Sequence, residues 1–395
     1  MAKRSGCQCH YVYFCPVNQQ VIYFDNAATT RVLAEVAELM FHSHLNNFGN
    51  PSSPHEVGRH ARAAVEQSRR SIASLLNTQP GEIFFTSGGT EANNAILLGC
   101  IKYHGRKHII TSRLEHPSVL QTILYLQKKS DCTCHFVKTD AKGVVDLGHL
   151  EQLLAANPGA MVSLMHANNE LGNLLPLKVV GGLCQQYKAF FHSDTVQTIG
   201  KVLLDLKEIP LDFAALSAHK FHGPKGVGAM FIRAGKVFLP FMQGGAQERN
   251  MRPGTENVQG IMGMAKALEL VHWDMDAVTL NITAIKNFLI KALSESIPGI
   301  VFNGDIFGDA LPTILNISLP LGIDAGLLLP RLDLEGICVS TGSACSSGSS
   351  KQSQVLAALG ADPKIPNLRI SISRFNTPEE AKLLIKALTK ICNSP

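Results

Sequence analysis

The chain has 395 residues, more than one usual hydrophobic core, so we expect a large domain and a smaller one. Hydrophobic residues make up 45% of the sequence and charged residues 17%, which excludes a disordered chain and indicates a globular protein with some surface buried in an oligomer. The net charge of +5 comes without a basic run, and no 18-residue apolar stretch occurs, so neither nucleic acid nor a membrane is an expected partner.

The first 20 residues are expected to form an N-terminal tail without an apolar signal region. Ten cysteines fit a reducing, cytoplasmic compartment better than the disulfide framework of a small secreted domain. Cys7, Cys9 and Cys15 lack a matching second pair of zinc ligands, so we expect no metal site in the tail. The alternating run at 132–138 predicts a half-buried strand whose two cysteines serve core packing.

Two amphipathic helices are predicted after the tail. The first begins at Arg31 and ends before the irregular segment 46–54, and the second covers 61–76. A short strand at 82–86 then leads into a glycine turn and a helix start at 87–94. This order of strand, glycine turn and helix directs backbone N–H groups at a phosphate, although a Gly-Gly pair by itself also fits an ordinary turn.

Strand-like runs and helical segments alternate beyond this turn. The strand-like runs are 108–111, 160–165 and 228–233, and the helical segments between them include 117–129 and 177–187. This alternation predicts an α/β fold with a mainly parallel sheet, and we assign the large domain to 21–260.

The remaining part, 261–395, is expected to form a smaller α+β domain. Its predicted elements are a long helical region at 261–293, strands at 313–318 and 368–372, and helices at 325–334 and 378–391. Pro330 should kink or shorten the helix that contains it.

Two polar segments are the most informative part of the sequence. Residues 191–197 (FHSDTVQ) follow a β-prone run, so Asp194 and Gln197 are expected at the carboxyl end of a buried strand, where open α/β sheets bind ligands. A carboxylate there can pair with a protonated pyridine nitrogen, and Lys220 in residues 217–226 (SAHKFHGPKG) can hold an aldehyde cofactor as a Schiff base. Taken singly, Asp194 also fits a helix cap and Lys220 a surface amine. Together the two segments predict a pyridoxal phosphate site.

Cys345 lies in a run of serines and glycines that is too polar for a core strand and predicts a mobile loop. An exposed thiol on such a loop suits a nucleophile that must reach a substrate sulfur and then carry its product away. On loop composition alone, an incidental surface cysteine also fits.

In their order along the chain, the motifs resemble those of the NifS/IscS-type cysteine desulfurases, a branch of the fold-type I pyridoxal phosphate enzymes, from about residue 22 to 391. Besides the two polar segments and STGSACS at 340–346, they are YFDNAAT at 23–29, FGNPSS at 48–53, FTSGGTE at 85–91, EH at 115–116, HANNELG at 166–172 and RPGTEN at 252–257. The resemblance implies an α/β fold with a large, mainly parallel-sheet cofactor domain and a smaller α+β domain. It also implies a homodimer whose active sites lie near the subunit interface.

The resemblance implies three catalytic residues, Lys220, His116 and Cys345. His116 would stack on the cofactor ring and move protons, although without the resemblance it also fits a buried structural histidine. Asn169 and Gln197 would bind the phenolic oxygen side of the ring and Asp194 its nitrogen. The phosphate would be held by Gly89, Thr90, Ser217 and His219, and by Thr255 from the partner subunit.

The implied reaction converts free L-cysteine to L-alanine and leaves a persulfide on Cys345, which passes its sulfur to an acceptor such as an iron-sulfur scaffold protein. Arg369, helped by Asn50, would bind the substrate carboxylate as a bidentate partner. Arg374 is a nearby rival for that role, and Asn50 also fits a turn residue. No metal ligand is implied.

Three alternative functions stay open at this point. A selenocysteine lyase uses nearly the same residues, an aminotransferase of similar fold would depend on a keto acid, and a non-enzymatic metal-binding or scaffold protein would need no cofactor. Many housekeeping members of the family also carry a longer carboxyl tail that docks an iron-sulfur scaffold, whereas this chain stops at Pro395, so the sulfur acceptor is not assigned.

Overall fold

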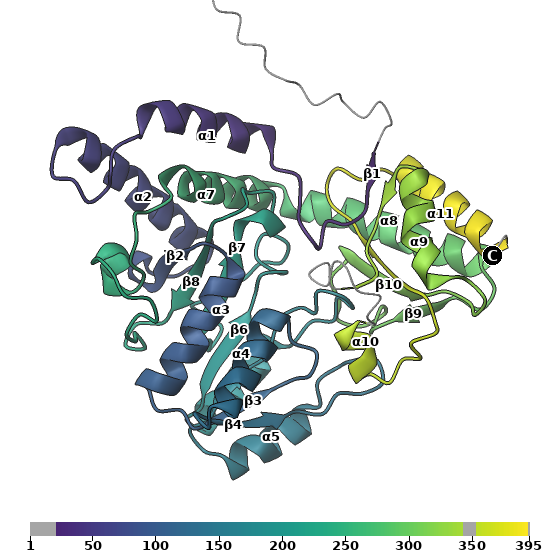
Figure 1. Ribbon diagram of the computed structural model, residues 1–395, viewed down its shortest axis with the longest axis horizontal. Coiled ribbons are helices and arrows are strands. Elements are labelled where there is room, and N and C mark those ends of the chain that lie inside the picture. Colours follow the sequence, from purple (N-terminus) through teal and green to yellow (C-terminus); the bar gives the residue numbers. More distant parts are fainter. Residues whose placement is uncertain (1–20, 343–352, 394–395) are drawn as a thin grey trace, which may run out of the picture.

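Two sheets with packed helices organise residues 21–342 and 353–393, which are the residues that the computed structural model describes (Figure 1). Within these residues, the larger sheet has seven strands in the order β2-β8-β7-β6-β5-β3-β4. The strands are β2 (Ile83–Thr86), β3 (His108–Thr111), β4 (Thr133–Phe136), β5 (Met161–Ser163), β6 (Phe190–Asp194), β7 (Phe213–Ser217) and β8 (Gly228–Ile232). The five strands from β4 to β7 are parallel and β8 is antiparallel to both neighbours, so the predicted mainly parallel α/β sheet is confirmed.

Helices cover both faces of this sheet, because successive strand residues point to opposite sides and both sides are apolar. In β6, for example, Phe190 packs into the cluster on one face and Phe191 into the cluster on the other. One face carries α3 (Gly89–Leu98) and α4 (Pro117–Lys128). The other carries α2 (Glu56–Leu75), α5 (Leu147–Ala156), α6 (Leu177–Gln186) and α7 (Val258–Trp273), and α1 (Ala34–Asn46) packs on α7 (Figure 1).

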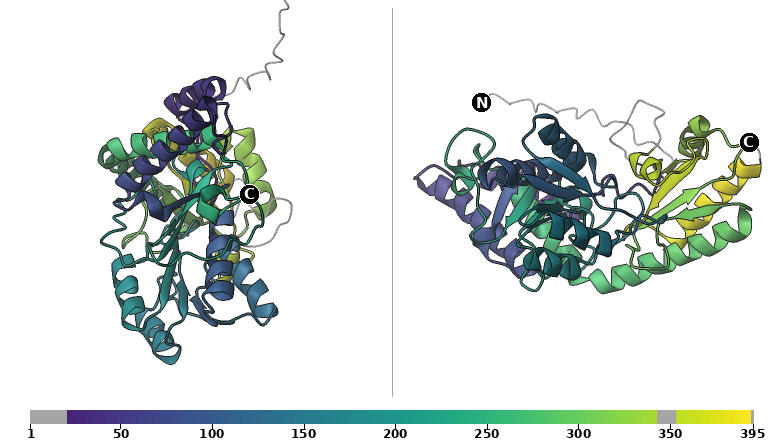
Figure 2. Two further views of the ribbon diagram at one scale, coloured as in Figure 1. Left: turned by 90° about the vertical axis from the view of Figure 1, so that its left-hand side faces the viewer. Right: turned by 90° about the horizontal axis from the view of Figure 1, so that it is seen from below.

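The smaller sheet, in the order β12-β10-β9, is antiparallel and has its own core. Its strands are β9 (Val301–Asn303), β10 (Ile314–Ser318) and β12 (Asn367–Ser371), and it packs against α8 (Met275–Ser296), α9 (Ala325–Leu334) and α11 (Pro378–Asn393). At the start of the described chain, β1 (Ile22–Tyr23) pairs in parallel with β11 (Ile337–Cys338), and Ile22 and Phe24 are buried in this second core. Figure 2 shows α8 extending from the part of the chain around the larger sheet along the part around the smaller sheet. None of the helices in the described ranges is both long and apolar enough to cross a membrane.

The structure corrects three details of the predicted elements. The helical region 261–293 is divided at Asp274, whose backbone is not helical (φ −118°, ψ 19°) and whose carboxylate binds Arg374. Of the two effects expected of Pro330, a kink or a shortened helix, the shortening does not occur, since α9 covers the whole predicted range. The central strand β7 was not predicted, since its FAALS sequence is poor in β-branched residues.

The division of the chain into domains stays a proposal. The apolar face of α7 packs on the large sheet and that of α8 on the small one, which favours a boundary near Asp274 rather than between residues 260 and 261. The burial of Ile22 in the small core likewise favours assigning the first strand to the smaller domain.

A buried ion pair joins α2 to the large sheet. The guanidinium of Arg69 contacts both carboxylate oxygens of Glu248 at 2.7 and 2.8 Å, and the side chains of both residues are no more than 3% exposed. Arg69 also donates to the carbonyl of Ile83 at 2.7 Å, and the backbone N–H of Phe85 donates to Glu248 at 2.7 Å. The pair therefore fixes the position of β2 relative to α2.

Replacing Arg69 by methionine is expected to lower the free energy of unfolding by about 3–5 kcal/mol, because it leaves the Glu248 carboxylate buried without its counter-charge. Urea unfolding followed by circular dichroism measures the change. Arg70→Met is the control, since Arg70 is exposed and binds Gln67 alone among the described residues, and it should change stability by less than about 0.5 kcal/mol. Equal effects of the two variants would contradict the assigned role of the pair.

Candidate active site

A cavity of about 190 Å³ lies where the parallel strands of the large sheet end, with Arg369 of β12 on its other side. This is the position at which open α/β sheets bind their ligands. Ten residues that the sequence analysis singled out line it together: Gly89, Thr90, His116, Asn169, Asp194, Gln197, Ser217, His219, Lys220 and Arg369.

Asp194 is the last residue of β6 and is 6% exposed, as expected for a carboxylate at the end of a buried strand. Its Oδ2 accepts a hydrogen bond from Asn93 Nδ2 at 2.8 Å, and its Oδ1 accepts one from the backbone N–H of Val196 at 3.0 Å. The carboxylate is therefore held in one orientation at the cavity wall. The bond to Val196 is also the contact expected of a cap or turn residue, so Asp194 can serve the turn that follows β6 while its carboxylate lines the cavity.

A series of hydrogen bonds between buried polar residues holds Asp194 on the side away from the cavity. The amide oxygen of Asn93 contacts His192 Nε2 at 3.1 Å, and His192 Nδ1 contacts the hydroxyl of Ser163 at 2.9 Å. Since an amide oxygen only accepts, His192 carries its proton on Nε2, and Nδ1 accepts from Ser163. Sequence reasoning missed Asn93, His192 and Ser163, and the only available signal was a polar side chain at positions that the pattern predicts to be buried.

Lys220 follows β7 in the short helical turn Ala218–Lys220 and lies half-buried at the cavity wall. Its Nζ donates to the carbonyl oxygens of Ala27 at 2.6 Å and Ala28 at 2.7 Å. These two carbonyls belong to the YFDNAAT motif, so this motif positions the lysine amine. Lys220 is accordingly not an ordinary surface amine.

Positive charge accumulates around the cavity. Burial, together with the neighbouring Lys220 and Arg369 cations, lowers the pKa of Lys201 to about 7. Burial, with Lys220 as the next cause, lowers the pKa of His219 to about 4. The amine of Lys220 and the guanidinium of Arg369 at the cavity wall suit an anionic ligand.

Arg369 is 2% exposed and is held at two of its nitrogens. One Nη donates to the carbonyl of Asn169 at 3.0 Å and the other to Asp25 at 2.8 Å, whereas its buried Nε has no hydrogen-bond partner among the described residues. The rival residue, Arg374, does not line this cavity and instead binds Asp274 at 2.7 and 3.0 Å. The geometry favours Arg369 as the group that faces a substrate.

Three predicted site residues are not among those that line the cavity. Asn50 is exposed, and its side chain accepts the N–H of Ser52 at 2.9 Å, which is the contact of a turn residue. Thr255 is exposed as well, and its contribution to the phosphate site of a partner subunit stays a prediction. Cys345 lies outside the described residues, as do Cys7, Cys9 and Cys15.

Three buried histidines are expected to make the protein less stable in mild acid. Burial lowers the pKa of His166 to about 4, of His192 to about 3 and of His222 to about 4. The unfolded chain binds protons at these rings below pH about 6.5, but the folded chain does not. The free energy of unfolding should therefore fall as the pH drops from about 6.5 to 4, by up to about 1.4 kcal/mol per pH unit for each ring.

Urea unfolding between pH 7.5 and 5 measures this dependence. His222→Asn should reduce the slope by about a fifth to a quarter, because His219 and His116, whose pKa values are also lowered, contribute besides the three buried rings. Asparagine tolerates the φ of 66° at this position and can replace the N–H that His222 Nδ1 gives to the carbonyl of Arg31. The control His60→Gln changes an exposed histidine and should leave the slope unchanged. A stability that is constant over this pH range would show that the prediction is wrong.

The chain is similar to known proteins in both sequence and structure. The family model of the class-V aminotransferases matches residues 22–384. The chain is 39% identical over 375 residues to the cysteine desulfurase IscS of Dictyoglomus turgidum, covering 94% of each protein, and 40% identical over 374 residues to a cysteine desulfurase of Sinorhizobium fredii, covering 94% of this chain and 96% of the relative. Among solved structures, it is similar to a NifS-like protein with a TM-score of 0.87 and 37% identity, over 95% of this chain and all of the other. It is also similar to SspA in complex with cysteine, with a TM-score of 0.77 and 29% identity, over 90% of this chain and all of the other.

Proposed function

The chain belongs to the aminotransferase class-V family, and we propose that it is a pyridoxal phosphate-dependent cysteine desulfurase, which converts L-cysteine to L-alanine and keeps the sulfur as a persulfide on Cys345. The observation that carries the proposal is the cavity that joins Lys220, Asp194 and Arg369. These groups match three separate tasks: holding the cofactor aldehyde, pairing with its ring nitrogen and binding the substrate carboxylate.

The residues around the cavity fit pyridoxal phosphate. Gly89 and Thr90 begin α3, and Ser217 and His219 lie across from them, so helix N–H groups and polar side chains surround a position suited to a phosphate. A Cβ on Gly89 would lie 2.6 Å from Cγ2 of Val196, so the helix start approaches the cavity wall more closely than any other residue type allows. When bound, the cofactor supplies an electron sink for the Cα of the attached amino acid.

Lys220 and His116 supply the proton transfers in this proposal. Lys220 can take the proton from the substrate Cα as a free amine. His116 Nδ1 lies 3.1 Å from the backbone N–H of Ser118 and 2.8 Å from its hydroxyl, so Nδ1 accepts and the ring proton is on Nε2. Burial also lowers the pKa of His116, which favours the neutral ring.

Arg369 orients the substrate in this mechanism. Its contacts with Asp25 and the Asn169 carbonyl fix the guanidinium plane and leave further N–H groups for a carboxylate. The sulfur step is balanced without an oxidant: Cys345 as thiolate bonds to the substrate sulfur, the carbon–sulfur bond breaks, and the carbon that keeps the electron pair takes a proton to become the methyl group of alanine.

We extend the proposal to a cytoplasmic homodimer that passes sulfur to an acceptor protein such as an iron-sulfur scaffold. The face formed by α1 and the segment after it supports a dimer, since Phe41, Leu45 and Phe48 are each more than 60% exposed there. Thr255 is exposed on the large body, as a residue that reaches a partner's site must be. L-cysteine as substrate is supported by the structural relative solved in complex with cysteine.

The test is the simultaneous measurement of alanine and of enzyme-bound persulfide from L-cysteine, after the protein has been loaded with pyridoxal phosphate. Alanine and persulfide in equal first-turnover amounts support the desulfurase. L-Selenocysteine is compared at the same concentration, and turnover of that substrate alone would assign the protein as a selenocysteine lyase. Turnover that requires a keto acid would indicate an aminotransferase, and the absence of a visible absorption band would refute a pyridoxal phosphate enzyme.

A further inference from the structure

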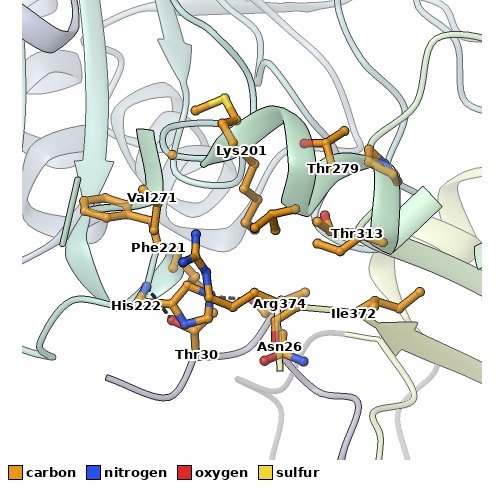
Figure 3. Close-up of a pocket in the computed structure, with 18 residues that line it drawn as sticks. Asn26, Thr30, Lys201, Phe221, His222, Val271, Thr279, Thr313, Ile372 and Arg374 are labelled. Atoms are coloured by element: carbon orange, nitrogen blue, oxygen red, sulfur yellow. Dashed lines mark hydrogen bonds between the residues drawn. The ribbon is translucent and has the colours of Figure 1, made fainter. Parts of the chain in front are cut away.

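Lys201 has no role in the mechanism above, yet it contacts a cofactor-binding residue directly. Its Nζ donates to Gln197 Oε1 at 2.9 Å, one helical turn back in the segment that follows β6. Lys201 does not line the cofactor cavity. It lines a separate cavity of about 40 Å³ together with Phe221 and Val271 (Figure 3). Its direct contact with the cofactor site is therefore the bond to Gln197, and its charge acts in addition on Lys220 and Arg369.

The backbone of this segment is shaped to bring Lys201 back toward Gln197. Gly200 has a φ of 77°, which L side chains rarely adopt, and a Cβ on it would lie 2.6 Å from Cβ of Phe221. The segment thus turns tightly against the residue next to Lys220. The same turn places the lysine amine beside the amide of Gln197.

The contacts of Gln197 determine which end of its amide meets the cofactor cavity. The carbonyl of Ala27 only accepts, so it must face the amide nitrogen, and Lys201 Nζ donates to the amide oxygen as an ammonium group or as an amine. The amide nitrogen then donates one hydrogen to the carbonyl of Ala27 at 3.0 Å, and Lys220 Nζ donates to this same carbonyl at 2.6 Å. One N–H of Gln197 remains, and Gln197 lines the cofactor cavity.

We propose that Lys201 is a positioning residue that holds the Gln197 amide with this N–H toward the phenolic oxygen of the bound cofactor. This inference rests on the proposed function. Without Lys201 the amide keeps its bond to the Ala27 carbonyl but loses the restraint on its oxygen, so its remaining N–H is held less firmly toward the phenolic oxygen. The ammonium group also polarises the amide and makes its N–H a stronger donor.

The consequence is a shift in the cofactor's own titration. A donor at the phenolic oxygen stabilises its anionic form, so the proton shared with the nitrogen that joins Lys220 to the cofactor leaves at lower pH. Lys201→Met should raise the apparent pKa of the bound cofactor's visible absorption band by about half a unit to one unit, the size expected for one weakened hydrogen bond. The dissociation constant for pyridoxal phosphate, measured on the apoprotein, should rise about 3–10-fold.

The chain offers a matched control. Lys286 is another buried lysine, 5% exposed, and donates to the carbonyl of Leu311 at 3.0 Å rather than to Gln197. Lys286→Met therefore removes a buried charge of the same kind and should leave the absorption pKa unchanged. A double-mutant cycle isolates the link: in a Gln197→Ala background, Lys201→Met should cause a clearly smaller shift, because only the direct effect of its charge remains. Lys201→Arg, which restores a cationic donor beside a cavity that can receive the larger side chain, should return the pKa to that of the natural chain.

The outcomes distinguish a failure of the proposed function from a failure of the positioning role of Lys201. If the natural chain takes up no pyridoxal phosphate, the proposed function fails, and the role of Lys201 fails with it. If it binds the cofactor but Lys201→Met leaves the absorption pKa unchanged, or shifts it equally with and without Gln197, the positioning role alone is overturned. Should Lys201→Met not fold, Lys201→Gln provides an uncharged donor at the same place and is expected to raise the pKa by a smaller amount. An unchanged value in that variant also overturns the proposal.

Discussion

Lys220→Ala is expected to reduce alanine formation from L-cysteine by about 10³-fold or more, because one amine holds the cofactor and moves the substrate proton. The variant should also lose the visible absorption band of the lysine-bound cofactor. Treatment of the natural protein with borohydride, followed by peptide mass spectrometry, should find the reduced cofactor on the peptide that contains Lys220.

The control for this prediction is Lys225→Ala. Lys225 lies in the same glycine-rich segment but is exposed, so its removal should change activity by less than about twofold. Since Lys220 Nζ also binds the carbonyls of Ala27 and Ala28, the variant can lose about 1–3 kcal/mol of stability, and activity must be measured where it is still folded. Full activity in folded Lys220→Ala would remove Lys220 from the mechanism.

The central pair of the site could be predicted from the sequence, Asp194 from the strand pattern before it and Lys220 from the glycine-rich motif that contains it. Asp194 ends a buried apolar run, and the polar segment around Lys220 follows the next strand of the sheet. Parallel neighbours bring such strand ends together whatever the details of packing. The strand that carries Lys220 was itself not predicted, so the glycine-rich motif rather than its strand pattern identified the lysine.

The residues that support this pair could not be predicted in the same way. Asn93 lies on a helix, His192 lies inside β6 and Ser163 ends β5, and each is an ordinary polar residue in its local sequence. Ser163 and His192 meet because the register of β5 and β6 places them opposite each other. Such a register is a property of the folded sheet and leaves no local sequence signal. The bond from Lys201 to Gln197 is a similar case, since helical spacing alone does not indicate that the two side chains meet at a cofactor cavity.

For the site residues taken from the resemblance, the sequence likewise does not predict which side chains face the cavity. Arg369 and Arg374 both follow from the sequence as carboxylate ligands, and only the folded chain separates them, because Asp274 binds one and the cavity contains the other. Asn50 lies in a recognisable motif, but its side chain stabilises a turn. A motif thus predicts which segments form the site better than it predicts which side chains face it.

Cys345→Ala is expected to abolish both alanine formation and enzyme-bound persulfide, with a loss of activity of about 10³-fold or more, because no other group of the mechanism accepts the substrate sulfur. Cofactor binding should not change, since none of the residues proposed to hold pyridoxal phosphate is altered. The visible absorption spectrum therefore tests the integrity of the variant, and alanine and persulfide are measured on the same sample.

Ser346→Ala is the matched control, because it removes a hydroxyl from the same serine-rich run and leaves the thiol. It should retain activity within about threefold of the natural chain. Alanine that persists undiminished in Cys345→Ala would show that the substrate sulfur leaves without this thiol, as in a lyase that releases it directly. Loss of persulfide together with unchanged alanine would therefore assign Cys345 to sulfur transfer alone, whereas loss of both products identifies it as the nucleophile that breaks the carbon–sulfur bond.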